Sequence, residues 1–596
     1  MRVAQLTIKN FRGVHEGVLL FPLHAVLVGD NNVGKSTVLE ALDLVLGPDR
    51  LARKPIIDEH DFYAGAYLTK APGENIATPT EIVIESIVTG LSERQRTKFW
   101  ANMEWWDNSK SSLVAETKGD GIEPALKVLF VGRYDPAEDD FEGTTFFATP
   151  QLEEGKRTEF RSSDKRECGY LYLRALRTGT RALSLERGSL LDIILRLKDI
   201  RPNMWENVLE RLRDLSVAED PALGLSDILS NLQSAIRRYV PAEWGVNPHL
   251  RVSDLTREHL RRTLTAFLAT GADQHSAPFH HQGTGTINLL VLALLSMIAE
   301  EKHSVIFAME EPEIAIPPYT QKRIVNQIRT LASQAIFTSH SPYVLEEFVP
   351  TGVLILNRSA SGTLTGTPVT LPTQKAIRKY RQDLRARFSE ALLARRVLIV
   401  EGFTELTAIP AAARRLSELD PGTFRSLENL GVALFDAESD NQVGSWGRFF
   451  RNLGKQTFAT YDKQEDAAHQ DIAANVDHAF MSSYRGFEEL IVTEVPHAVQ
   501  VRFVKVLMNE GRWPGHLATE HLDPFSNENS TRDALLDYLR WSKGAWGAAE
   551  LLSECTVDEM PKTVKVMLAA IDAVVEPRME AAKGDDGQAD TAKPEA

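Results

Sequence analysis

Residues 29–37 read GDNNVGKST, in which two glycines separated by four residues are followed by Lys-Ser. The apolar run 25–28 precedes this segment, and residues 37–46 carry apolar side chains at helical spacing. A buried strand, a glycine loop and a helix in this order are typical of a phosphate-binding loop. The loop amides and the positive end of the helix dipole favour an anion. The sequence therefore predicts an ATP site in an α/β fold.

Each residue type in this loop has a chemical role. Glycines let the backbone amides approach the phosphates, the lysine reaches the terminal phosphates, and the serine hydroxyl coordinates Mg²⁺. We predict that Ser36 is this magnesium ligand. The predicted nucleotide contacts are Gly29, Asn32, Gly34, Lys35, Ser36 and Thr37.

A second segment supplies the acidic groups that ATP hydrolysis needs. The apolar residues 305–309 lead directly into Glu310 and Glu311. Glu310 is predicted to hold the magnesium shell, and Glu311 to polarise the attacking water. Taken alone, this segment is better explained as an acidic loop after a buried strand. The hydrolytic interpretation is favoured because TSHSP follows one helix and one strand later and places His340 as a γ-phosphate sensor.

Size and composition limit the remaining possibilities. A chain of 596 residues exceeds what one hydrophobic core supports, so two or three domains are expected. The net charge of -15 argues against coating nucleic acid by bulk charge, but a local basic channel stays open. Cys168 and Cys555 are too isolated for a disulfide framework or a zinc site. We expect a soluble, cytoplasmic protein with no membrane-spanning segment.

A second α/β pattern follows a stretch rich in Gly, Thr and Pro at residues 359–373, which we interpret as a linker, and a basic helix at 375–396. The strand 397–400 is followed by EGFTE, a helix, and strands at 432–435 and 457–461. Alternating strands and helices predict another doubly wound sheet. The carboxyl ends of parallel strands meet at one edge, where such sheets bind ligands.

Acidic residues lie at these strand ends. Glu401 and Glu405 are one helical turn apart, and hard cations such as Mg²⁺ prefer carboxylate oxygens. An isolated pair of this kind is more often a solvated first helical turn. Asp436 and Glu438 follow the next strand and Asp462 follows the third, which favours a metal site.

The order of these motifs resembles a known family. NFRG (10–13), GDNNVGKST, HQGTGTINLL (281–290), MEEPE (309–313) and TSHSP (338–342) resemble the ABC-type ATPases of the SMC/RecF/OLD group. LIVEGFTE (398–405) resembles the start of the Toprim domain of the overcoming lysogenization defect (OLD) nucleases. The implied fold is an ABC/SMC-like P-loop ATPase domain with a helical insertion, followed by a Toprim-like α/β domain.

The resemblance also implies a function. OLD-family proteins are ATPases and metal-dependent DNA endonucleases, several of them in anti-phage defence, so ATP, Mg²⁺ and Mn²⁺ are the expected cofactors and DNA the substrate. Gly283 and Gly285 would contact ATP bound to the opposite subunit, which implies a homodimer or higher homo-oligomer. Glu488 resembles a further metal ligand, and Lys543 a residue that stabilises charge at the scissile phosphate. Some relatives act with a separately encoded helicase or reverse transcriptase.

The sequence departs from the Toprim pattern at one place. The usual Asp-x-Asp is replaced by Asp462-Lys463-Gln464, with Glu465 and Asp466 just beyond. Metal affinity is then lowered, or one of the following carboxylates substitutes, or cleavage has been lost. The alternative function is a non-cleaving, ATP-switched DNA-binding protein of the RecF or SMC type.

Five segments are expected along the chain. They are residues 1–184 and 266–385 as the two parts of the ATPase domain, 185–265 as a helical insertion for dimerisation, 390–575 as the Toprim-like nuclease domain, and 576–596 as a disordered tail.

Basic clusters could line a DNA channel, although solvated helix faces are the more common explanation for each. They comprise Arg174, Arg177, Arg181, Lys375, Arg378, Lys379, Arg381, Arg395 and Arg396. Trp105, Trp106, Trp541 and Trp546 are expected in cores or interfaces.

Overall fold

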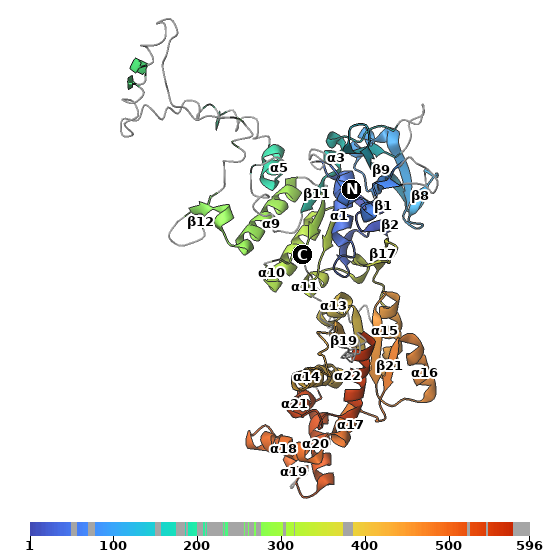
Figure 1. The fold of residues 1–596 in the computed structure, drawn as a ribbon, viewed down its shortest axis with the longest axis vertical. Helices are drawn as coiled ribbons and strands as arrows, with labels where there is room; N and C mark the ends of the chain where they lie inside the picture. Colours follow the sequence, from blue (N-terminus) through green and yellow to red (C-terminus); the bar gives the residue numbers. More distant parts are fainter. Residues whose placement is uncertain are drawn as a thin grey trace, which may run out of the picture. The chain divides into compact units, whose positions relative to one another are not determined.

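The chain divides into two compact units, Met1–Thr370 and Leu371–Ala596, in a computed structural model (Figure 1). The structure describes residues 1–48, 56–69, 78–117, 119–148, 157–173, 185, 189–198, single residues and short pieces between 207 and 269, 276–301, 305–314, 316–372, 385–520, 525–543 and 546–575. The predicted tail at 576–596 and most of the predicted insertion at 185–265 lie outside these residues.

The first unit is built on a 13-stranded mixed sheet. Its parallel side contains β11 (Tyr170–Leu173), β14 (Ile306–Glu310), β15 (Gln334–Thr338), β3 (His24–Val28) and β16 (Val353–Arg358), in that order. The sheet continues through β17 (Thr363–Pro368), β2 (Val14–Leu20), β1 (Arg2–Phe11), β6 (Ile82–Thr89), β9 (Ile122–Asp135), β7 (Met103–Asp107) and β8 (Ser112–Val114), and β10 (Asp140–Phe147) pairs with β9.

The parallel strands bring the sequence motifs of the first unit together. Glu310 at the end of β14 is in register with Thr338 at the end of β15. Thr338 is in turn in register with Leu27 of β3, just before the glycine loop. Three motifs that are far apart in sequence therefore end at the same edge of one sheet.

The helix after the glycine loop is buried against this sheet. It is α1 (Lys35–Leu46), whose apolar residues at helical spacing, including Val38, Leu42 and Val45, are fully buried. They share one hydrophobic cluster with residues of β1, β6 and β14. The other α-helices within the described residues of the unit are α2 (Glu93–Lys98), α3 (Ser162–Cys168), α5 (Leu190–Leu197), α9 (Thr284–Glu301), α10 (Pro318–Leu331) and α11 (Pro342–Leu345).

The predicted linker at residues 359–373 is wrong in part. Residues 363–368 form β17, which pairs antiparallel with β16 and parallel with β2. Gly362, with φ 83°, makes the turn between β16 and β17. The segment resembled a linker because its strand consists of Thr, Gly and Pro around a single buried leucine, Leu364.

The second unit has a four-stranded parallel sheet in the order β19 (Val432–Asp436), β18 (Arg396–Val400), β20 (Gln456–Tyr461) and β21 (His478–Met481). Helices α13 (Arg385–Leu393), α14 (Phe403–Leu419), α15 (Asp440–Asn452) and α16 (Asp466–Asn475) accompany it. Phe388 of α13 packs on Phe435 and Trp446, so the described part of the predicted basic helix belongs to this unit.

A helical group completes the second unit (Figure 1). It contains α17 (Phe487–Glu494), α18 (His497–Asn509), α19 (Gly515–Glu520), α20 (Glu528–Trp541), α21 (Gly547–Glu554) and α22 (Lys562–Val575). The apolar residues of these helices join those of α14 and β18 in one core.

The structure bears on the predictions about the cysteines and about membrane-spanning segments. Cys168 and Cys555 are both buried and form no disulfide. Among the described residues, none of the helices is both long enough and apolar enough to span a bilayer.

The tryptophans differ from one another in burial. Trp106 is buried, as expected, whereas Trp541 and Trp546 are exposed and do not lie in a core of this chain, so for these two a position in an interface stays a prediction.

A buried lysine makes the stability of the first unit depend on pH. Lys165 of α3 is fully buried, its Nζ donates to the carbonyl of Leu44 at 2.6 Å, and burial lowers its pKa to about 7. The unfolded chain, with a lysine pKa of about 10.4, binds more protons above pH 7, so the free energy of unfolding rises with pH.

We predict that Lys165→Met abolishes this contribution. Between pH 7 and 8.5 the wild type should gain about 1–2 kcal/mol more than the variant, measured by urea unfolding of both proteins. Parallel pH profiles would contradict the prediction.

Candidate functional site

The glycine loop of the first unit is open and preformed. Asn32 and Gly34 have φ values of 66° and 115°, and a Cβ at Gly29 would lie 2.7 Å from the carbonyl oxygen of Leu356. The Lys35 Nζ donates to the carbonyls of Gly29 and Asp30 at 2.8 and 2.9 Å. Burial lowers the pKa of Lys35. Ser36 is exposed and Thr37 half-buried in the first turn of α1.

The two glutamates after β14 differ in their partners. Glu310 Oε1 accepts a hydrogen bond from the Tyr172 hydroxyl of β11 at 2.9 Å. Glu311 has φ 44°, and its amide donates to the carbonyl of Thr338 at 2.9 Å. This conformation is unfavourable for a non-glycine residue and is held here by the neighbouring strand, as is common at functional sites.

Glu313, which the sequence analysis did not select, holds the segment that carries His340. Its Oε1 accepts from the Ser339 hydroxyl at 2.9 Å and from the His340 amide at 2.7 Å. Burial raises the pKa of Glu313. The His340 side chain projects at the exposed edge, where burial and the nearby Lys35 lower its pKa. His340, Lys35 and Glu311 are therefore parts of one electrostatic site.

Other motifs of the first unit have different roles. Arg12 of NFRG forms ion pairs with Glu40 of α1 at 2.6 Å and with Asp61 at 2.7 Å, so it connects the loop after β1 to the P-loop helix. Gly283 is exposed directly before α9, and Gly285 is in its first turn. Contact of these glycines with a second subunit stays a prediction.

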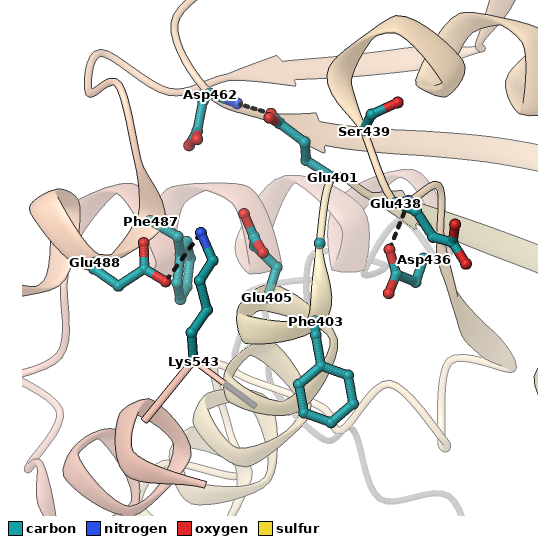
Figure 2. A pocket seen from close by; sticks show the side chains of 11 residues that line it. Glu401, Phe403, Glu405, Asp436, Glu438, Ser439, Asp462, Phe487, Glu488 and Lys543 are labelled. Carbon is teal, nitrogen blue, oxygen red and sulfur yellow. Dashed lines mark hydrogen bonds and ion pairs between the residues drawn. The ribbon is translucent and has the colours of Figure 1, made fainter. Parts of the chain in front are cut away.

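The second unit contains a cavity of about 360 Å³ at the carboxyl edge of its sheet (Figure 2). Val400 is in register with Asp436 on one side and Thr460 on the other, so the residues after β18, β19 and β20 meet there. The six acidic residues that the sequence analysis placed at this site, and Lys543, line this cavity. The lining residues are Glu401, Gly402, Phe403, Glu405, Asp436, Glu438, Ser439, Asp462, Phe487, Glu488 and Lys543.

Hydrogen bonds hold several of these carboxylates. Glu401 Oε2 accepts from the Asp462 amide at 3.0 Å, which joins the ends of β18 and β20. Glu488 Oε1 accepts from the Thr404 hydroxyl at 2.8 Å and lies 3.7 Å from Lys543 Nζ. Figure 2 shows the carboxylates of Glu401, Glu405 and Glu488 and the amine of Lys543 turned toward a common space.

Burial and neighbouring negative charges raise the pKa values of carboxyl groups in this cavity. Burial raises the pKa of Glu405 to about 8 and that of Asp462 to about 7, and neighbouring carboxylates add to both shifts. Burial also raises the pKa of Glu401. A bound cation would reverse these shifts, because it stabilises the charged carboxylates.

The donor chemistry of this cavity suits a hard divalent cation. Every acidic lining residue offers carboxylate oxygens, which Mg²⁺ and Mn²⁺ accept. Within the described ranges, no three Asp, Glu, His or Cys side chains are arranged so that together they could hold one metal ion. Mg²⁺ usually keeps several waters and binds through one or two carboxylates, which fits this open arrangement.

The departure at Asp462-Lys463-Gln464 leaves the cavity acidic. Lys463, Glu465 and Asp466 are exposed, and none of them is among the lining residues. The structure therefore gives no support to Glu465 or Asp466 as a replacement for the missing aspartate. The additional carboxylates come instead from Asp436 and Glu438, on the other side of β18.

The DNA channel that the basic clusters suggested stays a prediction. Arg174, Arg177, Arg181, Lys375, Arg378, Lys379 and Arg381 lie outside the described residues. Arg396 donates to Gln456 Oε1 and to the carbonyl of Leu430, both at 2.9 Å, so its role is structural. Arg395 is exposed.

Comparison with known proteins agrees with both sites. Residues 25–346 match the family model described as "AAA domain, putative AbiEii toxin, Type IV TA system". Residues 392–463 match the Toprim domain of proteins like the overcoming lysogenization defect protein. The chain belongs to this AAA-domain family and is an OLD-like ATPase–Toprim protein.

Individual relatives of this OLD-like chain are distant. The Old nuclease of Escherichia phage P2 is 20% identical over 466 residues, which are 71% of each chain. The C-terminal region of the Burkholderia pseudomallei OLD protein is 17% identical, with a TM-score of 0.23, over 31% of this chain and 99% of its own. The SMC head domain from Thermotoga maritima is 13% identical, with a TM-score of 0.28, over 62% of this chain and 100% of its own.

Three polar residues that support the two sites of this OLD-like chain were not predicted from the sequence. Glu313, Tyr172 and Thr404 each hold a predicted site group through a hydrogen bond. Glu313 could have been found only as the third acidic residue of MEEPE. No sequence pattern predicted the hydrogen bonds of Tyr172 and Thr404.

We predict that Glu313→Ala lowers kcat for ATP hydrolysis about tenfold with little change in KM, because His340 loses the acceptor of its amide. Glu313→Gln keeps one carbonyl acceptor and should retain most of the activity. Steady-state ATPase kinetics test both, with the exposed Glu93→Ala as the control. An unchanged kcat in Glu313→Ala would remove the positioning role.

We also predict that Mn²⁺ affinity of the second unit rises with pH. Glu405 is protonated near neutral pH, so a cation must displace its proton, and the dissociation constant should fall up to about tenfold per pH unit between pH 6 and 8. Calorimetric titrations without nucleotide should show a shallower dependence in Glu405→Gln. A pH-independent affinity in the wild type would refute this linkage.

Proposed function

We propose that the protein is an ATP-hydrolysing, divalent-metal-dependent DNA endonuclease. The observation that carries the proposal is the second-unit cavity, where six predicted acidic residues and Lys543 meet. Such a set of carboxylates with one lysine suits hydrolysis of a phosphodiester. The match to OLD-like Toprim domains and the name of the phage P2 relative, Old nuclease, support the same activity.

The residues of the cavity would have different roles in phosphodiester hydrolysis. Glu401, Glu405, Asp436, Asp462 and Glu488 would hold Mg²⁺ or Mn²⁺, which supplies an activated water and stabilises the leaving oxygen when bound. Thr404 keeps Glu488 oriented through its hydroxyl. Lys543 would offset the negative charge that develops on the scissile phosphate.

The first unit would bind and hydrolyse ATP. The loop amides and Lys35 would hold the phosphates, while Ser36 and Glu310 would hold magnesium. Glu311 would orient the attacking water, and His340 would contact the γ-phosphate. The location of Glu310 and Thr338 at the edge that carries the glycine loop supports these roles.

Assembly and biological role extend the proposal. Gly283 and Gly285 would complete the ATP site of a second copy, so that ATP controls pairing of subunits in a homodimer or larger homo-oligomer. The resemblance to OLD proteins supports a role in anti-phage defence in the cytoplasm, alone or with a helicase or reverse transcriptase.

A second candidate function is a non-cleaving, ATP-switched DNA-binding protein. The observation that favours it is Gln464, a neutral residue where Toprim domains carry an aspartate. The acidic lining of the cavity favours the nuclease, because a binding scaffold has no need for buried carboxylates with raised pKa values.

Cleavage of supercoiled plasmid tests the proposal. We predict nicking or linearisation with Mg²⁺ or Mn²⁺ that is lost in Glu401→Ala by at least about a hundredfold, since a metal ligand disappears. Glu465→Ala removes an exposed carboxylate outside the cavity and should leave cleavage unchanged. Lys35→Ala shows whether nucleotide binding controls the cut.

One result would replace the nuclease with the second candidate. It is the absence of cleavage with either metal by a protein that still hydrolyses ATP and binds DNA.

A further inference from the structure

Two exposed tryptophans lie on either side of Lys543 in the sequence. The exposed fractions are 55% for Trp541, at the end of α20, and 66% for Trp546, directly before α21. Large indole rings are normally covered, so exposure of two of them next to a proposed catalytic residue indicates a binding surface. We call Trp541 and Trp546 the tryptophan pair.

The backbone that carries the pair is closed tightly. A Cβ at Gly547 would lie 2.5 Å from Ser542 Oγ and 3.1 Å from Tyr538 Cε1, so the two sides of the loop touch. The Ser542 amide donates to the carbonyl of Tyr538 at 2.8 Å, which anchors the end of α20. Ser542, directly after Trp541, and Gly547, the first residue of α21, are therefore in close contact, and Lys543 and Trp546 lie next to them in the sequence.

Other aromatic rings pack against Trp541. Trp513 stacks on Tyr538, with centroids 5.4 Å apart and an interplanar angle of 14°. Tyr538 in turn lies 5.9 Å from Trp541, and His516 lies 5.9 Å from the same indole. This support fixes the Trp541 ring while more than half of its surface faces solvent. A rigid, exposed aromatic ring loses little entropy when a planar group stacks on it.

Lys543 links the pair to the acidic cavity. Its Nζ lies 3.7 Å from Glu488, and its side chain is 65% exposed, so the amine reaches the cavity from the loop. A phosphodiester bound at Lys543 must bring its neighbouring nucleotides past this loop. Unpaired bases offer flat π-faces to aromatic side chains, whereas bases within a duplex are already stacked on one another.

We propose that the tryptophan pair is a stacking platform for unpaired bases, so that the cavity acts on single-stranded or locally melted DNA. The proposal rests on the proposed nuclease function and specifies its substrate. A DNA strand fits the observations better than a protein partner does, because the same loop delivers the amine that faces the phosphate site.

Binding of fluorescent oligonucleotides to the full-length protein, with EDTA present to prevent cleavage, tests the platform. Trp541→Ala/Trp546→Ala should weaken binding of a single-stranded thymidine oligonucleotide by about tenfold or more. Trp541→Phe/Trp546→Phe keeps flat rings and should retain most of the affinity. Binding of a blunt duplex should change little in either variant.

Two controls separate stacking from other effects. Trp100→Ala removes an indole that is 73% exposed in the first unit and should leave binding unchanged. An abasic oligonucleotide of equal length has phosphates but no bases, so wild type and the double alanine variant should bind it equally.

The outcomes are distinguishable from those of the nuclease test. Equal affinity of wild type and the double alanine variant for the thymidine oligonucleotide, or no binding by the wild type, would overturn the platform. Loss of self-association in the double alanine variant with oligonucleotide binding intact would identify a surface between copies and also overturn it. Intact base-dependent binding without any plasmid cleavage would instead reject the nuclease and keep the platform.

Discussion

Convergence of carboxylates at one edge of a parallel sheet is the constraint on which the second unit depends. The register of β18 with β19 and β20 forces the residues that follow these strands together, among them Glu401 and Asp462. Glu405 and Glu488 are buried beside them. The raised pKa values show that this arrangement opposes ionisation, so it stabilises the protein only when protons or cations neutralise it. Carboxyl groups with strongly raised pKa values cluster at functional sites, so these values favour a functional role for the cavity.

The same geometric rule operates in the first unit, where Lys35 and the amides of the glycine loop lie beside the carboxylates of Glu310 and Glu311. There the strands β14, β15 and β3 end side by side, and the edge receives the glycine loop, Lys35 and the start of α1. That edge favours an anion, whereas the edge in the second unit favours a cation. The proposed activities, ATP hydrolysis and metal-dependent phosphodiester hydrolysis, follow from what each sheet edge carries.

Strand ends and local motifs were predictable from the sequence, because they depend on neighbouring residues. The positions of Glu401 and Asp462 followed from apolar runs and the rule for parallel strands. Contacts between distant segments were not predictable: Glu313 meets His340 and Thr404 meets Glu488 only after folding. The exposure of Trp541 also escaped prediction, since composition favours burial of large rings and only the fold decides which are covered.

Anomalous diffraction from crystals grown with Mn²⁺ tests the central claim, that the carboxylates of the second unit form a cation site. We predict manganese peaks inside the cavity, within coordination distance of Glu401, Glu405 or Asp462, and their loss in Glu401→Ala. The contradicting result comes from crystals that also contain ATP. It is an empty cavity at a Mn²⁺ concentration that fills the metal site beside the nucleotide in the first unit.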